Sequence, residues 1–304
     1  MALVIMKINF LKYKIIYPIF FGILFSASLF SIFYFGLKPG IDFTGGSILE
    51  VDFEIRPENQ VIQEKLKDLN LGDLVIQPTG EKGVIIRMKE IDESMHQQIN
   101  SKLGEISKIE EKRFENIGPV IGKELRQKTI ILILISLVAL LIYIAISFRK
   151  VSRPISSWQY GAISIITLTF DVLIPIGVFT LLGRFYNVQF NIPIVTALLT
   201  ILGYTINDKV IVFDRVRENL LRSRQENFET ILNQSLNQIL TRSLSTGSCT
   251  LFVLFSILFL GGETLKYFSL TLIIGIIIGT LTSLFLAPPL LLLWLKWRKR
   301  GSLA

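Results

Sequence analysis

The sequence has few of the residues that crosslink a chain or bind metals. It contains one cysteine, Cys249, and one histidine, His96, among 304 residues. A single cysteine has no partner for an intrachain disulfide, and one histidine with one cysteine cannot supply the ligands of a structural zinc site. Disulfide-stabilised folds and zinc-stabilised folds are therefore excluded.

Charged residues are also scarce. They make up 18% of the chain, against about 25% in ordinary soluble proteins, while hydrophobic residues make up 51%. A chain this apolar is not disordered, and its glycines show no collagen-like period. We therefore expect a lipid bilayer, rather than water, to surround most of it.

Six apolar runs are long enough to cross a bilayer, since a helix needs roughly 20 apolar residues to span the hydrocarbon core. The first run is longer than the apolar part of a signal peptide and no Ala-x-Ala-like site follows it, so we expect it to be retained. The predicted spans are residues 15–36, 129–148, 160–183, 190–213, 243–262 and 267–295.

Basic residues indicate the orientation of these spans. Lys and Arg gather before span one, after spans two and four and after span six, whereas the short loops on the other side hold only Arg184 and Lys266. By the positive-inside rule, both termini lie in the cytoplasm and residues 38–127 lie on the outer, periplasmic face. The net charge of +8 therefore reports membrane topology and is no indication of nucleic-acid binding.

Residues 38–127 predict a small α+β domain. Strand-like segments at 47–53, 74–77, 84–88 and 106–114 alternate with helical patterns at 58–69 and 93–103. The order β-α-β-β-α-β predicts a ferredoxin-like module. It closes near Gly118 and Pro119, and a charged stalk at 123–128 leads into span two.

The predicted fold is thus an α-helical membrane protein of six transmembrane helices, with a ferredoxin-like periplasmic domain between the first two. Residues 1–37 form the cytoplasmic N-terminus and span one, 38–127 the outer domain, and 128–304 spans two to six. The last part includes a cytoplasmic loop at 214–242 and a basic C-terminal tail.

The inner loop has apolar residues at helical spacing. They predict either an amphipathic helix lying at the membrane surface or a helix that packs beneath the bundle with no separate role. Periodicity reports a buried face and not a function, so we assign no site here. The residues are Phe228, Ile231, Leu232, Leu236, Ile239 and Leu240.

Charged residues inside membrane spans are costly and mark ion paths or proton relays. Asp171 lies at the centre of span three, Asp208 lies in the cytoplasmic third of span four, and Arg242 enters span five at a similar depth. Because Arg stays charged while a desolvated Asp can take up a proton, Asp208 and Arg242 could alternate between a tight and a broken ion pair. The alternatives are a static salt bridge for this pair and a carboxyl hydrogen-bonded to a neighbouring helix for Asp171.

Span six carries Gly275 and Gly279 in a small-x-x-x-small array that Ser283 and Ala287 continue, which predicts close helix packing. Residues 118–124 lack the spacing and the hydroxyl residue of a phosphate-binding loop. No nucleophile, base and oxyanion-stabilising set is present either. We therefore expect neither ATP binding nor enzymatic activity.

Three strings resemble motifs of the SecF family of bacterial protein-export subunits: GIDFTGG at 40–46, GYTINDKVIVFDRVREN at 203–219 and RSLSTG at 242–247. The resemblance covers essentially the whole chain, and the first string is shared with SecD. The matching positions in the first string are Gly40, Asp42, Phe43, Gly45 and Gly46. Those in the second string are Gly203, Asn207, Asp214, Arg215, Arg217, Glu218 and Asn219.

This resemblance implies half of a pseudo-symmetric transporter of the resistance-nodulation-division superfamily, with SecD as the other half. It implies an inner-membrane subunit that uses the proton-motive force, beside the SecY-SecE-SecG channel, to promote preprotein translocation after the SecA-driven step. The YidC insertase is a further candidate partner, and the proton is the coupling ion with no other cofactor. Asp208 and Arg242 match the family's proton-relay positions, and Asp171 matches a recurring family aspartate.

One position departs from the family pattern, which commonly has a small hydroxyl residue after the relay aspartate. This chain has Lys209 there. Consecutive helical positions do not face each other, so we expect Lys209 to snorkel to the cytoplasmic surface and leave Asp208 inward. A closer approach would oppose proton uptake by Asp208.

Two other functions remain open. The chain could be half of a lipid or drug efflux system of the same superfamily, although an outer segment of about 90 residues leaves room for only one small domain. It could also be a scaffold that holds the channel and the insertase together. A SecD-like partner would favour export, an outer-membrane channel partner would favour efflux, and proton independence would favour a scaffold.

Overall fold

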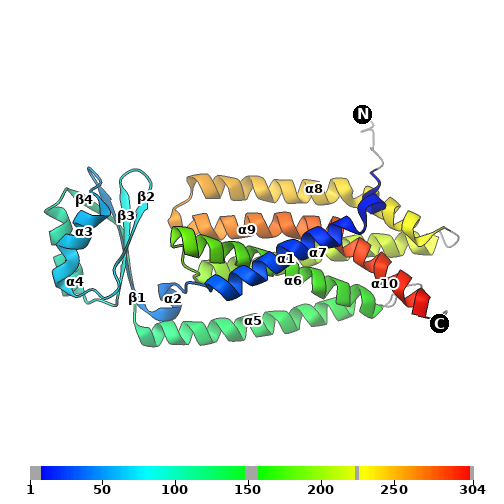
Figure 1. Cartoon of the computed structure of the whole chain (residues 1–304), viewed down its shortest axis with the longest axis horizontal. Helices are drawn as coiled ribbons and strands as arrows, with labels where there is room; N and C mark the ends of the chain where they lie inside the picture. Colours follow the sequence, from blue (N-terminus) through cyan, green and yellow to red (C-terminus); the bar gives the residue numbers. More distant parts are fainter. Residues whose placement is uncertain (1–7, 148–156, 223–225, 302–304) are drawn as a thin grey trace. The chain divides into compact units, whose positions relative to one another are not determined.

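The computed structural model describes residues 8–147, 157–222 and 226–301. They form two compact units. The helical unit comprises the described residues of 1–36, 133–182 and 193–304, and the sheet unit comprises Leu37–Leu132 and Gly183–Ile192. Figure 1 shows the helices and strands of both units coloured along the chain.

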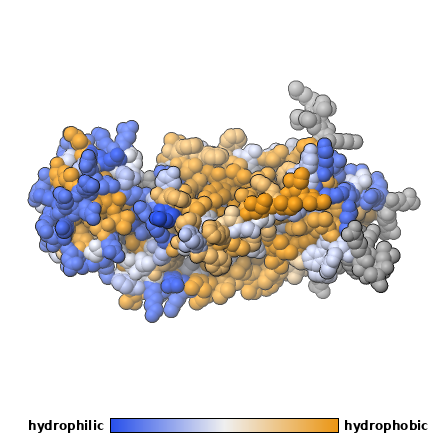
Figure 2. Space-filling view, viewed as in Figure 1, coloured by the Kyte–Doolittle hydropathy of each residue, from blue (hydrophilic) through white to orange (hydrophobic). Residues whose placement is uncertain are grey.

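Six helices of the described chain are long and apolar enough to cross a membrane, which confirms the predicted fold class. Apolar residues cover much of their surface (Figure 2), as helices in contact with lipid require. The short helix η1 (Phe10–Tyr13) precedes the first of them. The six are α1 (Ile16–Phe35), α5 (Pro119–Ser147), α6 (Ser157–Tyr186), α7 (Ile192–Arg222), α8 (Phe228–Leu260) and a sixth built from α9 (Glu263–Leu281), the π-helical turn η3 (Thr282–Leu286) and α10 (Ala287–Gly301).

The inner stretch at 214–242 does not form a separate surface helix, so that interpretation is wrong. α7 continues to Arg222, and α8 begins at Phe228 and runs without interruption into span five. No proline or glycine breaks residues 204–222 or 228–246, so both helices extend beyond the apolar runs. Most apolar residues of the stretch are buried with the end of α7 in one core, as the packing interpretation held: Phe228, Leu232, Leu236 and Ile239 with Val212, Phe213 and Val216.

The small-residue array of span six packs closely on α7, as predicted. A Cβ atom added to Gly275 would lie 2.1 Å from Ile201 Cδ1, and one added to Gly279 would lie 2.0 Å from Thr205 Cγ2. Real side chains cannot approach so closely, so only glycine allows this distance between α9 and α7.

The sheet unit contains a four-stranded antiparallel sheet in the order β2-β3-β1-β4. Together with the chain order, this is the predicted ferredoxin-like arrangement. Two helices pack on one face of the sheet, where Leu49 and Val51 of β1 meet Ile62 and Ile99. The elements are α2 (Ile41–Thr44), β1 (Gly46–Phe53), α3 (Asn59–Leu66), η2 (Lys67–Leu69), β2 (Val75–Thr79), β3 (Gly83–Met88), α4 (Glu93–Gly104) and β4 (Ile109–Ile117).

Two boundaries of this domain differ from those predicted. β4 begins three residues later than the predicted 106–114 segment, because Ile106 and Ser107 still bond to Leu103 in the turn that ends α4. The charged stalk at 123–128 is not a separate linker. It belongs to α5, which Pro119 opens and which a Glu124–Lys128 ion pair of 2.7 Å stabilises along its surface.

We predict that Gly275→Ala destabilises the helical unit by about 1–3 kcal/mol, because the added methyl group must displace Ile201. Gly22→Ala is the matched control, since nothing lies within 4 Å of a Cβ at that helical glycine. The midpoint of unfolding in mixed detergent micelles measures both. Equal midpoints for the two variants would show that α9 does not need this close approach.

Candidate functional site

Among the residues that the structure describes, three charged side chains are buried inside the helical unit. Asp171 comes from α6, while Asp208 and Lys209 are consecutive on α7. Asp171 and Lys209 are 0% exposed, and Asp208 is 5% exposed. Because a charge inside a membrane span is costly unless it is compensated, the partners of these three groups decide what the site can do.

Lys209 and Asp171 form a buried salt bridge between α7 and α6. Thr282 completes the arrangement, since its hydroxyl donates a hydrogen bond of 2.6 Å to Asp171 Oδ1. The Lys209 ammonium lies 3.4 Å from Thr282 Oγ1 and 3.5 Å from Ser283 Oγ. Both oxygens of Asp171 are therefore engaged, and the pair links α6, α7 and η3.

The buried position of Lys209 contradicts the prediction that it snorkels to the cytoplasmic surface. It lies on the buried face of α7 together with Ile206, Val212 and Phe213. The Asp171 carboxylate supplies a counter-charge there and η3 supplies hydroxyl oxygens, which together replace the water that the ammonium loses. Inside the unit, the ammonium thus has the counter-charge and the hydrogen-bond partners that replace the water it would have met at the membrane surface.

The hydroxyl groups at the pair come from the π-helical turn η3. Such turns interrupt the regular hydrogen bonding of a helix and recur at functional sites. Ser283 donates a bond of 2.7 Å to the carbonyl oxygen of Gly279, and that glycine lies against α7. Sequence reasoning missed Thr280 and Thr282 and treated Ser283 only as a small residue. The available signal was a group of hydroxyl residues in an otherwise aliphatic span.

Asp208 lies next to the pair along α7 but has weaker contacts. Its Oδ2 lies 3.5 Å from Thr280 Oγ1, a long hydrogen bond. The predicted counter-charge, Arg242, is exposed on α8, and no ion pair joins it to Asp208 among the residues that the structure describes. The predicted Asp208–Arg242 pair is therefore not formed in this structure, because Arg242 lies on the same exposed face of α8 as Ser245 and Cys249.

The cluster therefore contains two charges that neutralise each other and one that does not. Asp171 is held by an ammonium and a hydroxyl, whereas Asp208 accepts one long hydrogen bond. An ionised carboxylate without an ion-pair partner is costly in a membrane, and a proton removes that cost. Asp208 is the member of the cluster that can exchange a proton without breaking the salt bridge.

The first motif string, at 40–46, lies in the sheet unit, where Gly45 packs closely against the start of α5. Gly45 and Gly46 have φ angles of +77° and +132°, which glycine alone adopts easily. A Cβ on Gly45 would lie 2.8 Å from Pro119 Cα, and Asp42 accepts a 2.8 Å hydrogen bond from the backbone N–H of Ile192. Phe43 is half-buried beside them in α2.

The second string, at 203–219, is spread along α7 and does not form one site. Gly203 and Asn207 are exposed, and Asp214 pairs with Arg217 at 3.6 Å. Arg215 pairs with Glu218 at 2.8 Å.

Asn219, at the end of the same string, is buried. Its amide donates to Ser235 Oγ at 2.8 Å and to Gln238 Oε1 at 2.9 Å. These bonds fasten the end of α7 to α8.

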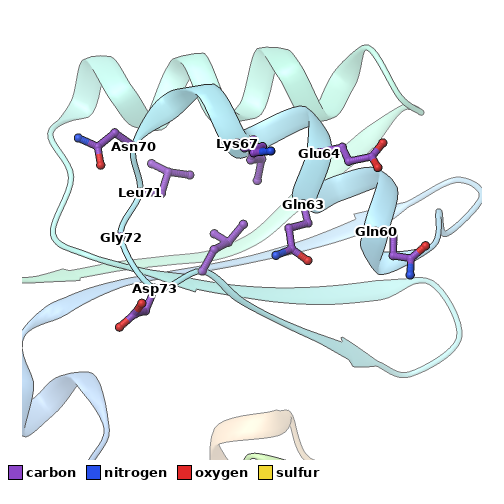
Figure 3. Close-up of a pocket in the computed structure, with 10 residues that line it drawn as sticks. Gln60, Gln63, Glu64, Lys67, Asn70, Leu71, Gly72 and Asp73 are labelled. Atoms are coloured by element: carbon purple, nitrogen blue, oxygen red, sulfur yellow. The ribbon is translucent and has the colours of Figure 1, made fainter.

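A surface hollow of about 860 Å³ is present in the sheet unit, between α3 and the segment at 70–74 (Figure 3). Its lining is mostly polar and includes Gln60, Gln63, Lys67 and Asp73. None of the predicted site residues lines it.

Comparison with known proteins gives a consistent family. Residues 97–297 match the family described as protein export membrane protein SecD/SecF, C-terminal, and residues 30–54 match the SecD/SecF GG motif. The chain is 38% identical over 276 residues to the protein translocase subunit SecF of Thermobaculum terrenum, covering 86% of this chain and 85% of that one. It is 36% identical over 304 residues to the SecF of Calditerrivibrio nitroreducens, covering 97% and 96%.

Solved structures give the same result. A crystal structure of SecDF, a translocon-associated membrane protein from Thermus thermophilus, superposes with a TM-score of 0.85 at 29% identity over 97% of this chain. A second SecDF structure, in a super-membrane-facing form, gives a TM-score of 0.71 at 30% identity over 99% of this chain. The chain spans 40% of the length of each SecDF chain.

We predict that Lys209→Met lowers the free energy of unfolding by about 3–5 kcal/mol, because it leaves Asp171 buried without a counter-charge. Lys209→Met combined with Asp171→Asn is expected to lose less than Lys209→Met alone, because the double variant contains no unpaired charge. Unfolding midpoints in mixed micelles measure the effect, with Arg242→Gln as an exposed control of small effect. Additive losses in the double variant would show that the two charges do not depend on each other.

Proposed function

The chain belongs to the SecF family of protein translocase subunits, and we propose that, with a SecD partner, it uses the proton-motive force to promote preprotein translocation across the inner membrane after the SecA-driven step. In this proposal it is a transport subunit and not an enzyme, and the proton is the coupling ion. The observation that carries the proposal is the buried Asp208, for which the described residues supply no ion-pair partner.

Proton uptake at Asp208 changes the charge of the buried cluster by one unit. A membrane potential contributes about 2.3 kcal/mol per charge per 100 mV, enough to bias an element with two arrangements that differ by a few kcal/mol. In this proposal the element is α7, which carries both Asp208 and Lys209. The position of α7 relative to α6 and η3 changes with the charge on Asp208, while the Lys209–Asp171 pair keeps α7 in contact with α6.

Polar residues on α7 and α8 support a membrane-embedded partner. Lipid cannot hydrogen-bond to the exposed side chains of Asn207 and Arg242, and small hydroxyl residues are typical of helix–helix interfaces in membranes. The Tyr204 and Thr250 hydroxyls, 3.4 Å apart, lie between the two helices. The exposed polar residues are Thr196, Thr200 and Asn207 on α7 and Arg242, Ser245, Thr246 and Cys249 on α8.

We assign this polar face to the SecD partner. The SecDF chain of Thermus thermophilus is long enough to contain a second half beside the part that matches this chain, which supports such a pairing. Arg242 is then covered in the assembled pair, where a guanidinium facing lipid would be costly. In this proposal Arg242 is an interface residue, and Asp208 has no ion pair among the described residues to break when it takes up a proton.

The same proposal sets the cellular arrangement. Both termini and the junction between α7 and α8 lie in the cytoplasm, and the sheet unit lies in the periplasm, where it contacts the emerging preprotein. The SecY-SecE-SecG channel and the YidC insertase are the proposed neighbours. The relatives are named as translocase subunits, which favours export over the efflux alternative.

We predict that Asp208→Asn keeps the fold and the assembly with SecD but abolishes the effect of a proton gradient. The amide retains an acceptor for Thr280 and cannot change charge. The measurement is preprotein completion in inverted vesicles after the ATP-driven motor is removed, with and without a gradient.

The control for this experiment is Asp73→Asn, which changes an exposed carboxylate of the sheet unit. A gradient effect that persists in Asp208→Asn at equal assembly would remove Asp208 from the mechanism and favour the scaffold function. Loss of the effect in both variants would point to a general defect of the preparation.

We also predict that the SecD partner protects Cys249, the only cysteine of the chain, from a membrane-permeant maleimide. Cys249 lies on the proposed interface, so labelling should be fast in the isolated chain and slow in the assembled pair. A cysteine introduced at Ile135 of α5 in a Cys249→Ser background, where the side chain is exposed, serves as the control. Equal labelling of Cys249 in both states would contradict the assignment of this face.

A further inference from the structure

The segment before α2 is fastened to the loop that precedes α7. Phe190 N–H donates to the carbonyl oxygen of Lys38 at 2.7 Å, and Gly40 N–H donates to that of Phe190 at 2.8 Å. The Lys38 ammonium also donates to Asn187 Oδ1 at 2.8 Å. These bonds hold the chain on either side of Pro39 parallel to the loop.

Asp42 extends this connection to α7 itself. Its Oδ2 accepts a hydrogen bond of 2.8 Å from the N–H of Ile192, the first residue of α7. The first N–H groups of a helix have no partner within it, and the helix dipole favours a carboxylate at this end. Asp42 therefore caps α7 from a part of the chain that lies 150 residues earlier.

The other side of α2 is locked to the sheet and to α5. A Cβ on Gly46 would lie 2.8 Å from the carbonyl oxygen of Met88 in β3, and one on Gly122 of α5 would lie 2.7 Å from Gly45 N. With so little space, the turn cannot slide against β3 or against the first turn of α5. The position of Asp42 is thus determined by the sheet, while its carboxylate bonds to α7.

α7 connects this cap to the buried charge cluster. Asp208 and Lys209 lie on the same continuous helix as Ile192, roughly 25 Å along an axis that rises 1.5 Å per residue. A change at one end of a hydrogen-bonded helix is passed to the other end because the helix is stiff along its axis.

We propose that Asp42 is a positioning residue that couples α7 to the sheet unit, so that the rearrangement of α7 around Asp208 reaches the domain through the Asp42–Ile192 hydrogen bond. This inference rests on the proposed proton-driven function and deepens it. In this proposal the motif at 40–46 attaches α7, which carries Asp208, to the sheet unit.

The test uses the full chain assembled with SecD in inverted vesicles and compares the gradient-dependent part of preprotein completion. Asp42→Ala removes the acceptor and is expected to lose most of the gradient-dependent part, with ATP-driven translocation and assembly unchanged. Asp42→Asn keeps an acceptor oxygen and is expected to retain most of it. Asp92→Ala is the matched control, because Asp92 caps α4 within the sheet unit through a 2.9 Å bond from Met95 N–H.

Hydrogen exchange provides a readout that does not depend on transport. Loss of the cap should speed exchange of the Ile194 and Val195 amides at the start of α7 by about fivefold in Asp42→Ala, with no change in Asp92→Ala. Ile192→Pro removes the donor instead, at a helix position that proline tolerates. It should reproduce the transport loss, and combining it with Asp42→Ala should add nothing.

The outcomes separate the two proposals. If the wild type responds to the gradient and Asp42→Ala responds equally, the coupling role of Asp42 is overturned while the proposed function stands. If the wild type does not respond, the proposed function fails, and this inference fails with it. If Asp42→Asn loses as much as Asp42→Ala, the hydrogen bond is not the cause and the inference is also overturned.

Discussion

The organisation of the helical unit depends on one salt bridge, which joins Asp171 of α6 to Lys209 of α7 where no water reaches either group. Neither charge is tolerable there alone, so the two helices must meet at this register. The pair also needs hydroxyl partners, which η3 supplies through Thr282 and Ser283. Glycines of α9 make that close approach possible. One electrostatic requirement thus accounts for the small residues, the hydroxyl residues and the π-helical turn of span six.

Because of the same salt bridge, the groups that stabilise the helix packing differ from the group proposed to exchange a proton. Lys209 is committed to Asp171, and this leaves Asp208 as a carboxylate with one long hydrogen bond at the edge of the buried cluster. A group that exchanges a proton must have two charge states of similar free energy, which a fully paired carboxylate does not have. Because Lys209 pairs with Asp171, the chain has a lysine next to its proposed relay aspartate without an ion pair between the two.

The sequence predicted the helices and strands better than the contacts between their side chains. Hydropathy located the six spans, and alternation located the strands, because both patterns report burial, which is local in sequence. The partner of Lys209 could not be predicted, because it depends on which helices become neighbours and at what register. The same holds for Arg242, whose exposure follows from the face of α8 on which it lies. The hydroxyl residues of span six were visible in the sequence, but their role required the position of Asp171.

The motif strings at 40–46 and 203–219 are far apart in sequence but meet on α7. Asp42 of the first string bonds to the start of that helix, Asp208 and Lys209 of the second lie along it, and Asn219 bonds its end to α8. The helix is therefore held at both ends by hydrogen bonds and in between by an ion pair. Such a helix cannot adjust one segment alone without breaking a buried contact, so it responds to a change of charge as a unit. That property is what a proton-driven element needs if an event within the membrane is to act on a domain outside it.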